Sequence, residues 1–345
     1  MRVGVLCPDH NLPSGGIRIL YRQVDILNRQ GVKACIIHSK EGFRCSWFEN
    51  STKIASIQRI LMARGRPEFD YVVIPEIYGQ SVIPYLKGYK KVLFNQGWCY
   101  TFKDYRLGAP LEETLYGDPD TVAVMASSDY IAEYLTFAFP KLKVCRVHCS
   151  LNPEIFGHRS EKKKQICFMP RRNAEDVKQV INILGLRGAL DDFKIVQIED
   201  RSEREVAEIL KESLIFLSFG HPEGFSLPPA EAMASGCIVI GYHGFGAKEF
   251  MKPDLSFPIE AGDIPAYVRA VEHVIADWNK DPGRLSWMAK QASEYVLNKY
   301  SPSREESDLA KFWSGLTSHS QSRPSNVGLK FTVHAASAAE THARP

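Results

Sequence analysis

Two glutamates, Glu223 and Glu231, stand eight positions apart around the start of a predicted helix. An apolar run at residues 214–219, the length of a strand buried in a parallel sheet, precedes them. The N-terminus of a helix after such a strand binds anions, because its first backbone N–H groups are unpaired. Carboxylates beside a phosphate can accept hydrogen bonds from paired sugar hydroxyls. The spacing favours a nucleotide-sugar site; the alternative is a solvated loop charge at Glu223 and a favourable helix-dipole partner at Glu231.

Local signals define this helix. Ser226 is the expected N-cap residue, and Pro228 and Pro229 suit the first turn because proline lacks the N–H that a first turn leaves unpaired. Gly236 is the expected end of the helix, before a second apolar run at residues 238–241. The segment therefore predicts a strand, helix and strand unit whose helix begins at the carboxyl edge of the sheet.

The segment EGFSLPPAEAMASG at residues 223–236, followed by GFGAKEF, resembles the glutamate-x7-glutamate signature of retaining glycosyltransferases with the GT-B fold, particularly family 4. The resemblance implies that Glu223 lies near the donor sugar and that Glu231 holds the nucleotide ribose. It also implies that the diphosphate is cradled by the backbone amides of Gly224, Phe225, Ser226 and Leu227. The segment after the next strand resembles a further element of the family through Gly244, Gly246 and Glu249, although its glycines are spaced unusually.

Basic residues follow the predicted strand at residues 166–169. Arg171 and Arg172 end this strand, and Lys178 begins the next helical pattern. Fixed cations in a dry cleft can stabilise a departing diphosphate, whereas the simpler interpretation is a solvated basic strand end. The family's strand-end arginine and following lysine resemble Arg171 and Lys178, and Arg172 could take the place of Arg171. The resemblance thus implies catalytic roles for Glu223, Arg171 and Lys178.

Glycines also follow the first predicted strand. Gly15 and Gly16 precede the first helical pattern, where glycine lets the backbone approach a ligand closely. A plain tight turn is an equal alternative, because the pattern lacks the GxGxxG spacing of dinucleotide folds. The resemblance implies a loop that faces donor phosphates and acceptor. Gln197 ends another strand, where its backbone could contact the base of the donor.

Asn95, Gln96 and Trp98 close a strand of the first half and offer hydrogen-bonding and stacking surfaces to a sugar acceptor. Many family 4 enzymes have a histidine near this position, and this chain has none there. His10 and His148 lie near other strand ends, where lone histidines are more often structural or solvated than catalytic.

No metal site or cofactor is expected. Asp118 and Asp120 match the DxD pattern of metal-dependent transferases, but they precede the strand at residues 121–127 and so lie at the amino edge of the sheet, opposite the ligand side. A turn explains Asp-Pro-Asp at that place. We therefore expect metal-independent catalysis, with the nucleoside-diphosphate sugar as a substrate.

Composition limits the possible binding partners and cellular location of the protein. The net charge of +3 gives no global field that favours nucleic acid, so no nucleic-acid partner is expected. Eight cysteines form no CxxC pair and mostly lie in apolar runs, as buried thiols do, which fits a reducing cytoplasm. The first residues are expected to form a strand, since they contain no apolar stretch long enough for a signal peptide, and no later run approaches the roughly 18 apolar residues of a membrane helix.

Strand-like and helical patterns alternate along the chain, which predicts an α/β fold with two doubly wound, Rossmann-like parallel sheets facing a cleft, as in GT-B proteins. At 345 residues the chain is long enough for two cores. We place the N-terminal acceptor domain at residues 1–152 and the C-terminal donor domain at residues 153–302. The helix at residues 303–316 is expected to pack back on the first domain, and residues 317–345 to form a disordered tail.

Residues 53–66 can be drawn as a basic amphipathic helix suited to peripheral contact with the inner membrane surface. An ordinary crossover helix packed on the sheet is the preferred interpretation. Many relatives act on lipid-linked acceptors, so peripheral contact with the cytoplasmic membrane stays an alternative.

Together these features predict a glycosyltransferase that moves a hexose from a nucleoside-diphosphate sugar to a hydroxyl of a sugar or glycolipid acceptor, with UDP-glucose as a favoured donor. The resemblance implies retention of configuration, and the breadth of the family suggests bacterial polysaccharide or glycoconjugate synthesis. The alternatives are a nucleotide-sugar epimerase on the same fold and a non-catalytic sugar-nucleotide-binding partner subunit.

Overall fold

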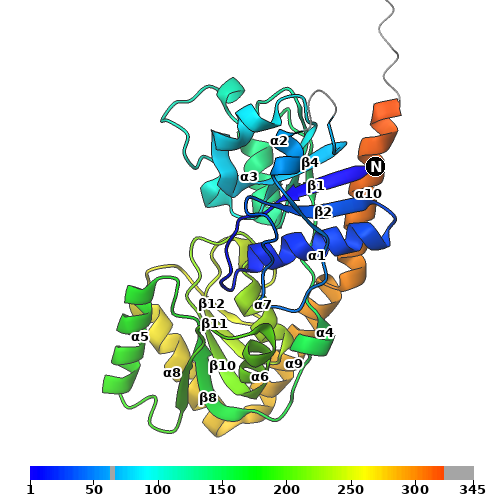
Figure 1. Cartoon of the computed structure of the whole chain (residues 1–345). Helices are drawn as coiled ribbons and strands as arrows, with labels where there is room; N and C mark the ends of the chain where they lie inside the picture. Colours follow the sequence, from blue (N-terminus) through cyan, green and yellow to red (C-terminus); the bar gives the residue numbers. More distant parts are fainter. Residues whose placement is uncertain (63–66, 322–345) are drawn as a thin grey trace, which may run out of the picture.

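The computed structural model describes residues 1–62 and 67–321, with side chains to residue 317. It contains two parallel sheets, each flanked by helices (Figure 1). We call the part built on the first sheet the first domain and the part built on the second sheet the second domain. The predicted α/β fold with two doubly wound sheets is confirmed.

The first sheet has seven strands in the order β3-β2-β1-β4-β5-β6-β7. Its side chains alternate between two apolar cores: Val73 and Phe94 face one side, and Val72 and Leu93 face the other. The strand order reverses between β1 and β4, which is the place where doubly wound sheets bind ligands. The strands are β1 (Arg2–Leu6), β2 (Lys33–His38), β3 (Ile54–Ser56), β4 (Tyr71–Pro75), β5 (Lys91–Asn95), β6 (Thr121–Ala126) and β7 (Val144–Arg146).

The second sheet has five strands in the order β12-β11-β10-β8-β9, all parallel. Its order reverses between β8 and β10. All six residues of β10 are buried, as expected for a central strand covered on both faces. The strands are β8 (Lys163–Phe168), β9 (Lys194–Gln197), β10 (Ser213–Ser218), β11 (Ile238–Tyr242) and β12 (Phe257–Ile259).

Helices cover both sheets. In α1 an apolar stripe is buried against the first sheet and consists of Ile17, Leu20, Val24 and Leu27. The α-helices are α1 (Gly15–Arg29), α2 (Gln58–Leu61), α3 (Asp129–Ala138), α4 (Pro153–Phe156), α5 (Ala174–Leu186), α6 (Glu203–Glu212), α7 (Leu227–Ala234), α8 (Ile264–Lys280), α9 (Pro282–Lys299) and α10 (Pro302–Gln321). Short 3-10 helices are η1 (Glu76–Leu86), η2 (Trp98–Tyr100), η3 (Leu111–Glu113) and η4 (Gly246–Glu249).

Helix α10 leaves the second domain and runs beside the first sheet (Figure 1). The carboxylate of Glu305 forms an ion pair with Arg22 of α1, with Oε2 at 2.8 Å from Nε. His148 Nδ1 lies 2.6 Å from Asp308 Oδ2, which gives this histidine a structural role. The ring of Trp313 contacts Tyr71 of β4. These contacts fix α10 to the first domain. Most of the tail predicted at residues 317–345 lies outside the described residues.

The prediction of one helix at residues 53–66 is wrong for the part that the structure describes. Ile54 pairs with Ile36 of β2, so residues 54–56 form an edge strand, and only residues 58–61 are helical. Pairing with a neighbouring strand overrides the local helical pattern here. Residues 63–66 lie outside the described residues, so the proposed amphipathic membrane surface has no support from this segment.

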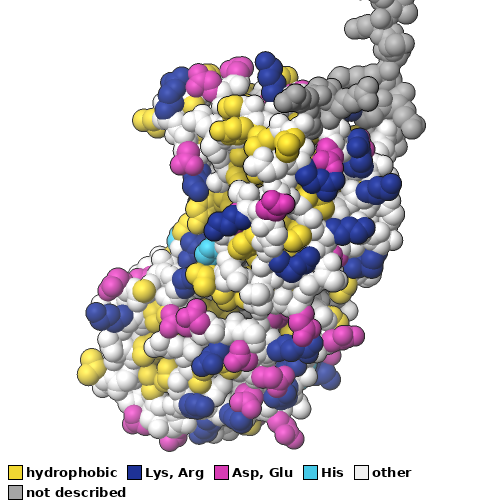
Figure 2. Space-filling model, in the orientation of Figure 1, with side chains coloured by type: hydrophobic (Ala, Val, Ile, Leu, Met, Phe, Trp, Pro, Cys, Tyr) yellow, Lys and Arg dark blue, Asp and Glu magenta, His cyan; other side chains and the backbone are white. Residues whose placement is uncertain are grey.

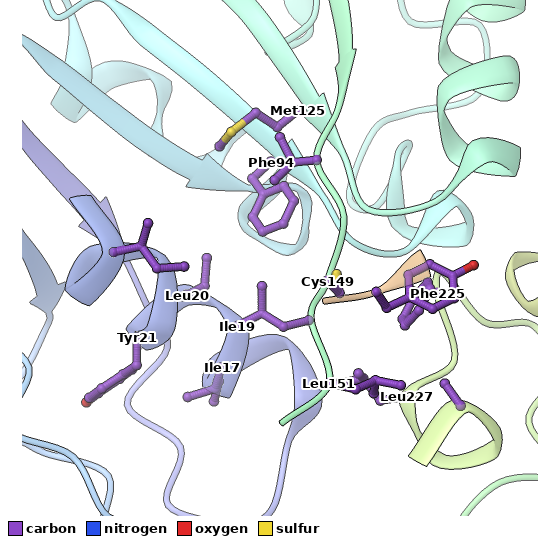
Figure 3. Packing of buried hydrophobic residues seen from close by; sticks show 14 of the residues in the cluster. Ile17, Ile19, Leu20, Tyr21, Phe94, Met125, Cys149, Leu151, Phe225 and Leu227 are labelled. Carbon is purple, nitrogen blue, oxygen red and sulfur yellow. The ribbon is translucent and has the colours of Figure 1, made fainter. Parts of the chain in front are cut away.

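One apolar core continues from the first domain into the second (Figure 3). Ile17 and Leu20 of α1 and Phe94 of β5 belong to the same buried cluster as Phe225 and Leu227, which begin the segment between Glu223 and Glu231. The predicted donor loop is therefore packed against the first domain. On the face shown in Figure 2, basic and acidic side chains are interspersed. Within the described residues, no helix has the length and apolar character that a bilayer crossing requires.

Candidate functional site

A cavity of about 540 Å³ lies between the carboxyl ends of the two sheets. Its lining loops follow β1, β2, β4, β5 and β6 in the first sheet and β8, β9 and β10 in the second. The two places where strand order reverses, between β1 and β4 and between β8 and β10, thus open on the same cavity. Its volume falls in the range of small-molecule sites, roughly 300–1,000 Å³.

Glu223 lines the cavity in the loop after β10. Its backbone N–H donates to Gly244 O at 3.0 Å, which ties this loop to the one after β11. Its Oε1 lies 3.1 Å from Arg172 Nε. Burial raises the pKa of Glu223, while the charges of Arg172 and Arg171 oppose that rise. Glu223 is therefore a carboxylate fixed by Arg172, and the alternative interpretation of a solvated loop charge does not apply.

The cations of the site differ from the expected set. Both Arg171 and Arg172 line the cavity; Arg171 Nη1 donates to Pro13 O of the first domain at 3.2 Å, and Arg172 pairs with Glu223. Lys178 lies on the exposed face of α5 and does not line the cavity. The role of Lys178 in the cleft therefore stays a prediction that the lining of this cavity does not support.

Glu231 lies in α7 and is only 5% exposed. Its Oε1 pairs with Arg18 Nη2 of α1, and Arg18 Nη1 pairs with Glu203 at the start of α6. Burial raises the pKa of Glu231, and Arg18 opposes the rise. Burial alone would lower the pKa of Arg18, but the charges of Glu231 and Glu203 hold it above the ordinary value. One cation of the first domain thus pairs with two carboxylates of the second.

Ser226 does not cap α7 through its side chain, contrary to expectation. Its φ of 66° is left-handed, and no side-chain hydrogen bond to the helix forms. An N-cap side chain usually reaches the helix N–H groups from an extended backbone, which this residue lacks. Ser226, Leu227 and Pro228 nevertheless line the cavity, so the N-terminus of α7 opens on it.

Gly224 and Gly15 mark close contacts between the domains. A Cβ atom on Gly224 would overlap the carbonyl oxygen of Gln96, and one on Gly15 would lie 2.6 Å from Leu227 Cδ1. Gly16 is roomier, with Gln96 Oε1 at 3.5 Å from its added Cβ. The glycine loop after β1 and the loop around Gly224 are therefore both in close contact with the opposite domain.

The residues predicted to face an acceptor lie in different environments in the structure. Gln96 lines the cavity. Asn95 is fully buried, and its side-chain amide donates to Thr101 Oγ1 and Tyr116 Oη. Trp98 packs edge-on against Tyr130 and Phe245. Neither Asn95 nor Trp98 lines the cavity. Burial and internal hydrogen bonds give Asn95 a structural role, so the prediction that it faces an acceptor is wrong. The acceptor role of Trp98, which is partly exposed, stays a prediction. Gln197 also lies outside the cavity lining.

Glu249 joins the two domains rather than facing the cavity. Its carboxylate accepts from the backbone N–H of Asp129 at 2.7 Å, from Arg146 Nη2 at 2.8 Å and from Tyr300 Oη at 2.7 Å. An added Cβ on Gly246 would overlap the carbonyl of Gly224. The element formed by Gly244, Gly246 and Glu249 thus supports the Glu223 loop from behind.

Asp118 and Asp120 form a turn at the amino edge of the first sheet, as the sequence predicts. Both carboxylates pair with the buried Lys91, at 3.1 Å and 3.4 Å from its Nζ. Within residues 1–62 and 67–321, no group of three His, Cys, Asp or Glu side chains could hold a metal ion. All eight cysteines are free, and six of them are buried as expected, whereas Cys99 is exposed and Cys145 is partly buried.

Several cavity residues were not found from the sequence. They come from helices and loops that only the fold brings together. Sequence reasoning considered His10 and gave it no role, and it did not identify Arg18, Trp47, Glu76, Arg201 and Glu203. Trp47 Nε1 is a buried donor without a partner in the described part of the protein. Glu76 follows β4 directly, and a polar residue at the end of a buried strand was the signal that could have identified it.

Comparisons with known proteins agree with this geometry. Residues 174–292 match the family described as Glycosyl transferases group 1, so this part of the chain carries that domain. An alpha-1,6-glucosyltransferase of Actinobacillus pleuropneumoniae serotype 7 is 39% identical over 82 residues, which is 24% of this chain and 25% of that protein. The chain thus matches about a quarter of the length of this relative.

Solved structures resemble nearly the whole chain. Sucrose-phosphate synthase from Thermosynechococcus elongatus has a TM-score of 0.70 at 12% identity, covering 92% of this chain and 99% of that one. The Anabaena protein Alr3699/HepE in complex with UDP and glucose has a TM-score of 0.62 at 10% identity, covering 92% and 100%. At such identities the likeness concerns the fold, and the fold is GT-B.

Proposed function

We propose that this protein is a glycosyltransferase that moves a hexose from a nucleoside-diphosphate sugar to a hydroxyl of a sugar or glycolipid acceptor. The observation that carries this proposal is one cavity in which Glu223, Arg172 and the N-terminus of α7 meet. Support also comes from the matched Glycosyl transferases group 1 domain and from the glucosyltransferase relative. A UDP-sugar is favoured as donor because the similar Anabaena structure contains UDP and glucose.

In the proposed reaction the cavity binds the donor with its diphosphate at the N-terminus of α7. The backbone N–H groups of residues 224–227, together with Arg171 and Arg172, attract the negative charge that the leaving diphosphate gains. Glu223 accepts hydrogen bonds from hydroxyls of the donor sugar, and Glu231 from the ribose. Arg172 takes the role first assigned to Lys178, because Arg172 lines the cavity and Lys178 does not.

We propose that the reaction retains configuration and needs no metal. The bond between the anomeric carbon and the phosphate oxygen breaks while the acceptor oxygen bonds to the same face of that carbon. The acceptor proton passes to the departing diphosphate, so no protein carboxylate becomes covalently attached. Contact between the domains would exclude water from the cavity and limit hydrolysis of the donor. Bacterial polysaccharide or glycoconjugate synthesis is the setting we propose.

The test begins with thermal shifts against UDP-, GDP-, ADP- and dTDP-sugars. A donor at about 100 times its dissociation constant should add roughly 2.7 kcal/mol of stability. Transfer to an acceptor panel is then measured for the wild type and for Glu223→Gln. Glu294→Gln is the control, since Glu294 is exposed on α9 and does not line the cavity. Transfer that Glu223→Gln abolishes and Glu294→Gln preserves supports the proposal.

Two other outcomes would overturn it. Isomerised sugar nucleotide formed from donor alone would identify an epimerase. Tight nucleotide binding without transfer to any acceptor would identify a non-catalytic sugar-nucleotide binder.

A further inference from the structure

Glu76 is a buried carboxylate that the proposed reaction has not yet used. It follows β4 at the point where the order of the first sheet reverses, it lines the cavity, and it is 5% exposed. The loop after β5 has no histidine at the place where the family resemblance implies one, and neither Asn95 nor Trp98 lines the cavity. Glu76 is therefore a first-domain carboxyl group in the wall of the cavity, opposite the proposed donor side.

The loop after β5 holds this carboxylate in one orientation. The backbone N–H of Gln96 donates to Glu76 Oε2 at 2.9 Å, and a Cβ on Gly97 would lie 3.2 Å from Glu76 Oε1. Burial raises the pKa of Glu76 to about 7, while hydrogen bonds from the backbone of Gln96 and Gly97 and the charge of Lys103 oppose the rise. The charge of Glu76 in turn contributes to the raised pKa values of Cys99 and Tyr116.

Glu76 also lies beside the proposed donor site. Gln96, which donates to Glu76, packs its carbonyl oxygen so tightly against Gly224 that no Cβ fits there. Burial raises the pKa of the Cys99 thiol, the charge of Arg172 lowers it, and the charges of Glu223 and Glu76 raise it. Glu76 and Cys99 of the first domain line the same cavity as Arg172 and Glu223 of the second, so the two glutamates reach this cavity from opposite domains.

A second observation points to a ligand rich in hydrogen-bond donors. The side-chain oxygen of Gln96 is buried at the cavity and has no partner within the described residues, and the same holds for Ser127 Oγ. Carboxylate and amide oxygens accept hydrogen bonds, and the hydroxyls of a sugar or polyol supply them. An unsatisfied buried acceptor costs free energy that such a hydroxyl would recover.

We propose that Glu76 and Gln96 form the acceptor subsite, in which the Glu76 carboxylate accepts a hydrogen bond from the sugar or polyol hydroxyl that attacks the donor. This inference rests on the proposed transfer reaction. Glu76 orients the acceptor oxygen toward the sugar that Glu223 holds, and the acceptor proton still leaves with the diphosphate. The ionised carboxylate is the better acceptor, so transfer increases as the pH rises through about 7.

The test is Glu76→Gln, which keeps an oxygen that can accept from the Gln96 backbone. The acceptor kcat/KM should fall by about 10- to 100-fold, because a hydrogen bond to a charged group is lost. The thermal shift given by UDP and the rate of donor hydrolysis should stay unchanged. Glu133→Gln, at an exposed glutamate on α3, is the matched control. The increase in transfer near pH 7 should disappear in Glu76→Gln, which a purely structural role would not cause.

Gln96→Ala is the second variant, because it removes the unpartnered side-chain oxygen and leaves the backbone donor to Glu76 in place. It should raise the acceptor KM and leave the UDP shift unchanged, even if Glu76→Gln proves unstable. If the wild type transfers the sugar and either folded variant has the same acceptor kcat/KM and KM as the wild type, the acceptor subsite alone is overturned. Absence of transfer by the wild type would overturn the proposed function as well, which distinguishes the two failures.

Discussion

The guanidinium group of Arg18 pairs with the carboxylate of Glu231 across the boundary between the two domains. The same guanidinium reaches Glu203, so one cation of α1 holds the start of α6 and the middle of α7. Glu231 is also the residue proposed to bind the donor ribose. A ribose hydroxyl pair must therefore share this carboxylate with Arg18 or take its place, which couples donor binding to contact between the domains.

Arg18→Ala should strongly destabilise the protein. It leaves two carboxylates without their cation, and one of them, Glu231, is only 5% exposed. Removing one partner of a buried pair costs about 3 to 5 kcal/mol. The control on the same helix is Arg29→Ala, whose partner Glu306 is exposed, at a cost of about 0 to 1 kcal/mol. Urea unfolding measures both, and equal losses in the two variants would contradict the role given to Arg18.

Arg172→Ala and Lys178→Ala should differ sharply in activity. Arg172 lines the cavity and pairs with Glu223, whereas Lys178 is exposed on α5 outside it. Loss of a fixed group that stabilises transition-state charge reduces kcat on the order of 100-fold. Arg172→Ala should show this loss, and Lys178→Ala should stay near the wild type. Steady-state transfer kinetics decide the matter, and a larger loss in Lys178→Ala would restore the assignment made from sequence.

Gly224→Ala should weaken the contact between the domains. An added Cβ meets the carbonyl oxygen of Gln96, a backbone atom that cannot rotate away. Overpacking of this kind costs about 1 to 3 kcal/mol. In contrast, Gly185 of α5 has no atom within 4 Å of an added Cβ, so Gly185→Ala should gain up to about 1 kcal/mol of helix propensity. Thermal unfolding of both variants tests this, and a neutral Gly224→Ala would show that the contact can relax.

The fold followed from local patterns because both sheets are built from short apolar runs with helical segments between them. Leu217 and Ile240 each lie in a run whose burial on two faces is visible in the sequence itself. The edge strand at Ile54 was missed for the opposite reason. Its residues are only partly buried, and their strand conformation depends on pairing with Ile36, which local sequence does not reveal.

The candidate site was predictable only where its residues share one loop. Glu223 and the segment up to Glu231 form a single strand, turn and helix unit, and Arg171 and Arg172 end a neighbouring strand. Arg18 reaches the site from more than 200 positions away in the chain, through a pairing that only the packed domains create. The left-handed backbone of Ser226 was also hidden, because a serine before two prolines is typical of a standard N-cap.

The final prediction concerns Glu76 and the dependence of stability on pH. Its pKa in the folded protein is about 7, against an ordinary value of 4.5, so the folded state binds the proton more tightly than the unfolded state. The resulting stability is present below pH 4.5 and is lost as the pH rises through 7. At about 1.4 kcal/mol per pKa unit, the loss is about 3 kcal/mol. Urea unfolding at pH 5 and pH 8 should show this loss in the wild type and in Glu133→Gln. Glu76→Gln cannot ionise, so its stability should fall less over this interval, and an equal fall in all three proteins would show that Glu76 titrates as an ordinary carboxylate.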